Sequence, residues 1–164
     1  MGSLKIVMRA LLRKGGRCAV ASAAVPAGMV GVLPTTMTND EDETVTITYR
    51  AGEIPAADLA EKPLGQPSAE PLTGEITTRS QVFFTSADDK IVSGTWECEP
   101  GASRWEFTTR GEIIHVLSGR MTVARDGEEG VELTPGSSAV FELGWQGTWT
   151  VHETLRKVFV VYRP

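Results

Sequence analysis

The feature that most restricts what this chain can fold into is a series of short β-type segments between residues 76 and 162. Each segment is rich in β-branched and aromatic residues, and turn dipeptides such as Pro100-Gly101 and Asp126-Gly127 separate them. The connections are too short for the crossover helices of a parallel sheet. The pattern therefore predicts an all-β sandwich or barrel of antiparallel strands. The predicted strands cover residues 76–85, 90–97, 104–109, 112–117, 120–125, 131–133, 138–142, 148–153 and 157–162.

The start of the chain differs from the rest in charge. Residues 1–36 carry five basic side chains and no acidic one, although the whole chain of 164 residues has a net charge of −5. This change predicts an N-terminal extension over residues 1–43 and a folded domain over residues 44–164. The extension is interpreted as a disordered tail or a start misassigned ahead of Met37, as a targeting signal, or as a membrane contact.

Two further segments precede the β-rich region. Residues 44–49 alternate Thr with Val, Ile and Tyr, which predicts a strand with one buried face. Residues 51–75 contain four Pro and three Gly, which predicts an irregular strap with one helical turn at residues 56–61. We expect this strap to wrap an edge of the barrel or a partner subunit, and to carry no chemistry of its own.

Composition excludes some classes of function. The net charge is negative and no basic cluster follows residue 36, so a nucleic-acid partner is not expected. No segment is long and apolar enough to cross a bilayer, so no membrane partner is expected. The two cysteines, Cys18 and Cys98, lie far apart, which favours free thiols in a reducing, cytoplasmic compartment.

Two glycine-bounded blocks resemble the two signature motifs of the cupin superfamily. In the first block, Gly101, Glu112 and Gly119 keep the motif spacing, with six residues between Glu112 and Gly119. In the second block, Gly136 and Gly144 fit the motif. The runs SGTWECEPG and GTWTVHETLRKVFVVY are similar to the small cupins grouped with ethanolamine-utilisation and ureidoglycine aminohydrolase proteins. The resemblance covers roughly residues 75–164 and implies an RmlC-like jelly roll, the double-stranded β-helix of cupins.

The motif histidines of cupin metal sites are replaced. Gly147 stands where the second motif has its histidine, and the first pair falls at Glu106 and Thr108 or at Trp105 and Phe107, depending on the spacing. We therefore expect no tightly bound transition metal and no other cofactor. A weak site for a hard cation between Glu106 and Glu112 stays open as an alternative.

The alternation of side chains along a strand predicts which residues face the interior. If Glu112 points inward, as its motif position implies, then Ile114 and Val116 share its face, and Ile113, His115 and Leu117 point outward. In the second block, Trp149, Val151 and Glu153 share the inward face of Gly147, and His152 points outward. Both histidines thus face away from the cavity, and outward Ile113 and Leu117 predict a homodimer.

The resemblance and this alternation yield candidate site residues. Glu112 and Glu106 are the candidate acid or base residues. The candidate ligand-binding residues are Arg104, Thr108, Glu142, Trp145, Trp149 and Trp96. For the charged residues the alternative is a structural salt bridge, and for Trp96 and Trp149 it is core packing. Trp145 is the candidate ligand gate. Of Arg156 and Lys157, at most one can reach the cavity, and we expect both to be solvated or salt-bridged.

Three classes of function remain open. The first is a cupin that binds a small polar molecule, as an accessory or sensor protein in amine, ureide or sugar metabolism. The second is an enzyme that acts on such a metabolite with a pocket glutamate as acid or base. The third is a structural or partner-binding dimer with a filled barrel. An open cavity with Glu112 at its wall would separate the first two from the third.

Overall fold

Two long strands, β6 (Gly111–Arg125) and β9 (Gln146–Tyr162), run through the whole domain and pair with each other along most of their length. The computed structural model describes residues 46–67 and 69–164, which contain two short 3-10 helices and nine strands. The remaining elements are η1 (Ala51–Glu53), η2 (Ala56–Asp58), β1 (Ala60–Pro63), β2 (Ala69–Pro71), β3 (Thr77–Thr85), β4 (Ile91–Cys98), β5 (Gly101–Glu106), β7 (Val131–Leu133) and β8 (Ser138–Phe141).

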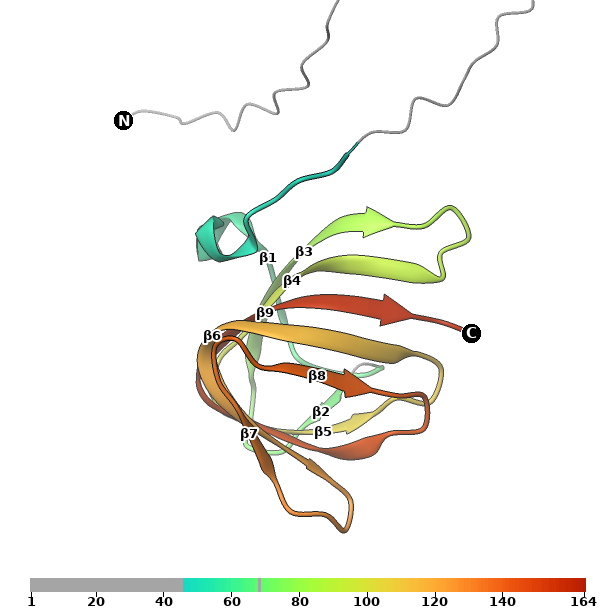
Figure 1. Ribbon diagram of the computed structural model, residues 1–164. Coiled ribbons are helices and arrows are strands. Elements are labelled where there is room, and N and C mark those ends of the chain that lie inside the picture. The colour runs from blue at the N-terminus through green and yellow to red at the C-terminus, as the bar shows by residue number, and fades with distance from the viewer. Residues whose placement is uncertain (1–45, 68) are drawn as a thin grey trace, which may run out of the picture. The chain divides into compact units, whose positions relative to one another are not determined.

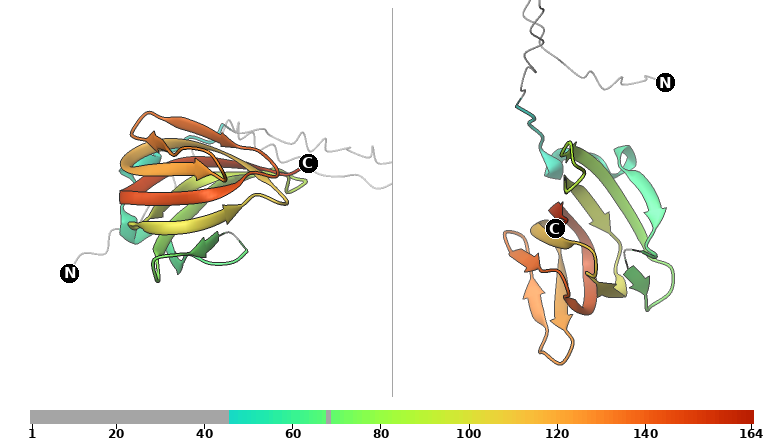
Figure 2. Two further views of the ribbon diagram at one scale, coloured as in Figure 1. Left: turned by 90° about the horizontal axis from the view of Figure 1, so that it is seen from below. Right: turned by 90° about the vertical axis from the view of Figure 1, so that its right-hand side faces the viewer.

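The strands form one antiparallel sheet that curls into two facing layers (Figure 1). In one layer, the C-terminal half of β9 lies between β4 and the N-terminal half of β6, with β3 and β1 beyond β4 and β8 beyond β6. In the other layer, the N-terminal half of β9 lies between β5 and the C-terminal half of β6, with β2 beyond β5 and β7 beyond β6. The all-β jelly-roll prediction is therefore confirmed, and Figure 2 shows the curl from two further sides.

Four of the predicted strands are parts of the two long strands β6 and β9. The segments predicted as 112–117 and 120–125 are one strand, and those predicted as 148–153 and 157–162 are another. The two segments of β6 are not separated by a turn at Ser118 and Gly119, because this point is a bend where the pairing register shifts. Gly119 has a positive φ of 81°, and a Cβ there would lie 2.2 Å from the carbonyl oxygen of Thr154. A glycine is required where β6 turns from one layer to the other.

The segments before β3 also depart in part from prediction. The predictions for the extension over residues 1–43 and for residues 44 and 45 concern residues outside the described ones. Residues 46–49 are exposed and form no strand, so the strand predicted over residues 44–49 is wrong for this part. The strap contributes one edge strand to each layer, because β1 pairs with β3 and β2 pairs with β5. The helical turn predicted at 56–61 is present as the short η2.

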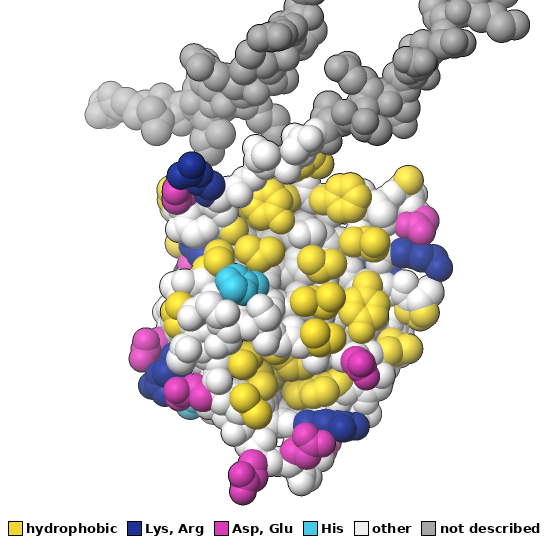
Figure 3. Space-filling view, viewed as in Figure 1, with side chains coloured by type: hydrophobic (Ala, Val, Ile, Leu, Met, Phe, Trp, Pro, Cys, Tyr) yellow, Lys and Arg dark blue, Asp and Glu magenta, His cyan; other side chains and the backbone are white. Residues whose placement is uncertain are grey.

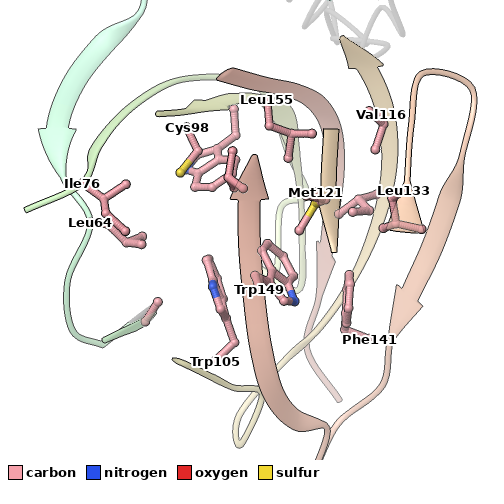
Figure 4. Packing of buried hydrophobic residues seen from close by; sticks show 14 of the residues in the cluster. Leu64, Ile76, Cys98, Trp105, Val116, Met121, Leu133, Phe141, Trp149 and Leu155 are labelled. Atoms are coloured by element: carbon pink, nitrogen blue, oxygen red, sulfur yellow. The ribbon is translucent and has the colours of Figure 1, made fainter. Parts of the chain in front are cut away.

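Aromatic side chains fill one end of the space between the layers (Figure 4). Trp149 is fully buried and stacks on Trp105 with ring centroids 4.0 Å apart. Phe107 stacks on Phe141 at 5.4 Å, and Phe141 lies 4.7 Å from Trp149. Large buried rings of this kind supply much of the apolar area that a small β domain removes from water.

The outer face of the first layer is apolar. Ile113 lies between Val140 of β8 and Val160 of β9 in the sheet, and both Ile113 and Val140 are exposed. Figure 3 shows hydrophobic side chains gathered over this face. The predicted homodimer would cover it, and the homodimer stays a prediction. No helix in the described part of the chain is long and apolar enough to cross a membrane.

Candidate functional site

A cavity of about 320 Å³ lies between the strap and the inner face of the first layer. It reaches the surface, because Lys62 and Val82 at its edge are exposed. Glu112 is part of its wall. The barrel is therefore open at this point rather than filled by side chains. The lining residues are Lys62, Pro63, Leu64, Gly65, Gln66, Pro67, Thr78, Ser80, Val82, Trp96, Trp105, Arg110, Glu112, Lys157, Phe159 and Val161.

A buried ion pair forms part of the cavity wall. Lys157 Nζ donates a hydrogen bond to Glu112 Oε1 at 2.6 Å, and the two side chains are only 2% and 6% exposed. The Lys157 ammonium also lies over the rings of Trp149 and Trp96, at 4.4 and 4.7 Å from their centroids. Contact with the faces of aromatic rings favours the charged form of an amine.

Burial works against that charge. Desolvation lowers the pKa of Lys157, while the charge and hydrogen bond of Glu112 oppose this shift. The positive charge of Arg110 adds to the lowering. Burial also raises the pKa of the neighbouring Cys98 thiol to about 12. Burial is thus the main cause of the lowered pKa of Lys157, and Glu112 is the ion-pair partner that opposes it.

The alternation of side chains positions this pair, much as the sequence predicts. In β6, Glu112, Ile114 and Val116 are buried, while Ile113 and His115 are exposed. In β9, Lys157 shares its face with Leu155, Phe159 and Val161, all apolar, and therefore points into the domain. Glu153 departs from its predicted inward direction, because it lies beyond the bend, is exposed and pairs with Arg120 at 3.2 Å.

The opposite face of β9 carries a second buried ion pair. Arg156 donates to Glu97 Oε2 from Nε at 3.0 Å and from Nη2 at 2.6 Å. Its Nη1 donates to the carbonyl oxygens of Ala51 and Ile54 in the strap. Arg79 also reaches Glu97, at 3.3 Å. The prediction of salt-bridged side chains at Arg156 and Lys157 is confirmed, but the expectation of solvent exposure is wrong for both.

Three predicted site residues lie on the other side of β5. Arg104, Glu106 and Thr108 line a separate hollow together with Gln66, Pro67, Ala69 and Glu70. Asp126 accepts hydrogen bonds from both terminal nitrogens of Arg104, which lowers the pKa of Asp126. This is the structural salt bridge that stood as the alternative for Arg104. Glu106 is exposed and separated from Glu112, so the two carboxylates do not form a shared cation site.

The tryptophans divide by role. Trp96 and Trp105 both line the cavity. Trp149 packs in the core and touches the cavity chemistry only through Lys157. The ligand-gate prediction for Trp145 finds no support in the lining, because Trp145 packs edge-on against Phe107 and Phe141. Glu142 is exposed in the turn after β8 and does not line the cavity.

The replaced histidine positions are occupied by apolar groups. Trp105 and Phe107 are the inward pair of the first motif, and both are buried. At Gly147 a Cβ would meet Ala124 O at 2.2 Å and the Trp145 ring at 2.5 Å, so the position has no room for an imidazole. Within residues 46–67 and 69–164, no three His, Cys, Asp or Glu side chains group as metal ligands. The donor set does not fit a cupin metal centre.

Sequence reasoning missed the basic residues of the cavity. Lys157 had a signal: it is a lone lysine among the apolar residues of its own strand face, which is typical of a buried, paired amine. Arg110 and Lys62 had no such signal, since single basic residues beside a turn or in a strap are common on protein surfaces. The strap itself, expected to carry no chemistry, supplies residues 62–67 of the cavity wall.

Sequence comparison finds a similarity to one family. Residues 85–159 match the EutQ-like cupin domain. Over these residues the chain is similar to EutQ-like cupins. The match spans strands β4 to β8 and most of β9, and so includes Glu112 and Lys157. No curated protein matches the sequence.

Solved structures resemble the cupin domain in fold. A DUF861-family protein of unknown function from Pseudomonas syringae pv. tomato is 17% identical with a TM-score of 0.54, and the match covers 63% of this chain and 43% of that one. EutQ from Clostridium difficile is 19% identical with a TM-score of 0.47, covering 54% and 64%. A putative ethanolamine utilisation protein EutQ from Salmonella typhimurium is 15% identical with a TM-score of 0.48, covering 63% and 98%. The chain thus spans less than two thirds of the first two structures, and at these identities the likeness concerns the fold alone.

Proposed function

We propose that the cupin domain binds a small polar molecule in the cavity beside the Glu112–Lys157 pair. The observation that carries this proposal is an open cavity of about 320 Å³ with a buried ion pair in its wall. Ligand sites for small molecules have volumes from about 300 Å³ upward, mostly apolar linings and a few convergent polar groups. The open cavity favours ligand binding over the filled-barrel dimer. An accessory or sensor role in the cytoplasm, in amine, ureide or sugar metabolism, is part of the proposal.

A second candidate is an enzyme that uses Glu112 as acid or base. It is favoured by the 2.6 Å contact between Glu112 and Lys157 and by the lowered pKa of Lys157, because an amine with a lowered pKa gives up its proton more readily. Glu106, the other candidate, lies outside this cavity. The cavity is therefore the place to test both candidates.

The test is a thermal-shift screen against amines, ureides and sugar acids with a matched pair of variants. Ser80→Trp fills the cavity, because Ser80 lines it. Gln81→Trp adds the same bulk on the next residue of β3, whose side chain is exposed and outside the lining. We expect a ligand that raises the melting temperature of the wild type and of Gln81→Trp but leaves Ser80→Trp unchanged. A ligand that stabilises Ser80→Trp equally, with all proteins folded by circular dichroism, would contradict the proposal.

A further inference from the structure

The cavity carries more positive than negative charge. Its lining contains three basic side chains, Lys62, Arg110 and Lys157, and one acidic side chain, Glu112. Glu112 is neutralised by Lys157 at 2.6 Å. The charges of Lys62 and Arg110 are therefore left for another partner.

Arg110 stands apart from the other arginines of the described chain. Each of the others donates to a carboxylate or a carbonyl oxygen, whereas Arg110 forms no hydrogen bond or ion pair with another described residue. Arg110 lines the cavity, and its charge adds a small contribution to the lowering of the pKa of Lys157, which burial mainly causes. An anion beside Arg110 would relieve this repulsion between two cations.

Lys62 approaches the same cavity from the strap. Its ammonium forms no ion pair with a described acidic residue, and its carbonyl oxygen is fixed by Thr78 Oγ1 at 2.9 Å. The backbone of β1 is thus held in place while the long side chain remains able to move over the cavity. Lysine in such a position acts as a mobile point charge, and arginine as a planar donor for two oxygens.

Apart from Gln66, Thr78 and Ser80, the rest of the lining is apolar and aromatic. Trp96 and Trp105 meet edge to face with centroids 6.2 Å apart, and Leu64, Phe159 and Val161 complete this side. Such walls offer no replacement for the water around a small, strongly hydrated anion such as phosphate. They suit the planar or aliphatic body of an organic molecule.

We infer that the cavity selects a small organic monoanion, a carboxylate with an apolar body. The carboxylate meets Arg110 and Lys62, and the body lies against Trp96 and Trp105. This inference rests on the proposed function, since it names the class of ligand for the same cavity.

The experiment compares three probes of one shape and different charge. Benzoate, benzamide and benzylammonium are titrated into the full chain and followed by isothermal calorimetry and by tryptophan fluorescence. We expect benzoate to bind at least about tenfold more tightly than benzamide, and benzylammonium to bind least. Acetate, which lacks the body, and inorganic phosphate are expected to bind at least about tenfold more weakly than benzoate.

Variants connect the preference to its residues. Arg110→Gln is expected to reduce benzoate affinity toward that of benzamide while benzamide affinity stays unchanged. Arg125→Gln is the matched control, because Arg125 is exposed, pairs with Glu128 at 3.1 Å and lies outside the cavity. Circular dichroism of each variant confirms that it is folded.

The outcomes separate the inference from the proposed function. Equal or tighter binding of benzamide or benzylammonium, blocked by Ser80→Trp, overturns the anion preference and leaves ligand binding in this cavity standing. If acetate or phosphate binds as tightly as benzoate, the inference that the ligand needs an apolar body is overturned. Benzoate that fails to bind at about 10 mM overturns the inference, and the ligand screen with Ser80→Trp then decides the proposed function separately.

Discussion

Two buried ion pairs lie back to back across β9, and they differ in how completely they are partnered. On one face, Arg156 binds Glu97 and two strap carbonyl oxygens, and Glu97 also meets Arg79. On the other face, Lys157 meets one carboxylate oxygen of Glu112 and otherwise aromatic rings. The two basic residues are neighbours in sequence, so their side chains point to opposite faces of β9. Arg156 binds the strap on one face, and Lys157 borders the cavity on the other.

The difference shows how to tell a structural ion pair from a site. Removal of charges from water is costly, and a protein recovers that cost when every donor and acceptor of the pair is satisfied. Arg156 meets this condition through its carboxylate and carbonyl partners. The Glu112–Lys157 pair meets it only in part and borders open space, so it retains hydrogen-bonding capacity for a ligand.

The largest expected effect comes from breaking the cavity pair. Lys157→Met should lower the free energy of unfolding by about 3–5 kcal/mol, because Glu112 is left buried without its cation. The double variant Glu112→Leu/Lys157→Met should recover most of this loss, because two apolar side chains replace a poorly partnered pair. Urea denaturation followed by circular dichroism measures both. A double variant as unstable as the single one would show that the Glu112–Lys157 pair, like the Arg156–Glu97 pair, stabilises the fold.

The opposite pair should not tolerate the same exchange. Glu97→Leu/Arg156→Met should remain destabilised by about 2–4 kcal/mol, because the carbonyl oxygens of Ala51 and Ile54 lose their donor and Arg79 loses a carboxylate. The same urea titrations provide the comparison. Full recovery in this double variant would mean that Arg156 does not fasten the strap.

The smallest effect concerns pH. The pKa of Lys157 is lowered in the folded protein from an ordinary value of 10.5, so the unfolded chain binds more protons there and stability rises with pH toward that value. The free energy of unfolding of the wild type, relative to Glu112→Leu/Lys157→Met, should therefore increase as the pH rises toward 10.5, by less than about 1.4 kcal/mol per pH unit. A difference that falls with pH would contradict the lowered pKa.

The alternation of residues along β6 was sufficient to predict much of the site. It placed Glu112, Ile114 and Val116 on the inner face and Ile113 and His115 on the outer one, because period-two alternation is a local property of a strand. The bend at Gly119 could not be distinguished from a hairpin, since both need a residue with positive φ. Only the pairing with β9, far along the chain, decides between them.

The cavity chemistry was less predictable because it depends on distant partners. Lys157 and Glu112 are 45 residues apart, and Arg156 and Glu97 are 59 residues apart. Without the fold, two adjacent basic residues at the head of a strand indicate a surface. The strap was expected to be inert for a similar reason: nothing in a Pro- and Gly-rich segment reveals which wall it will complete.

The central position of β9 also affects the order of folding. This strand is the hydrogen-bonded partner of β4, β5 and β6, and Ile91 at the start of β4 lies opposite Tyr162 at its end. Synthesis runs from the N-terminus, so both layers leave the ribosome with their central strand missing. Until residues 146–162 emerge, β4, β5 and β6 lack their common partner, and their free edges and apolar faces need protection from other chains.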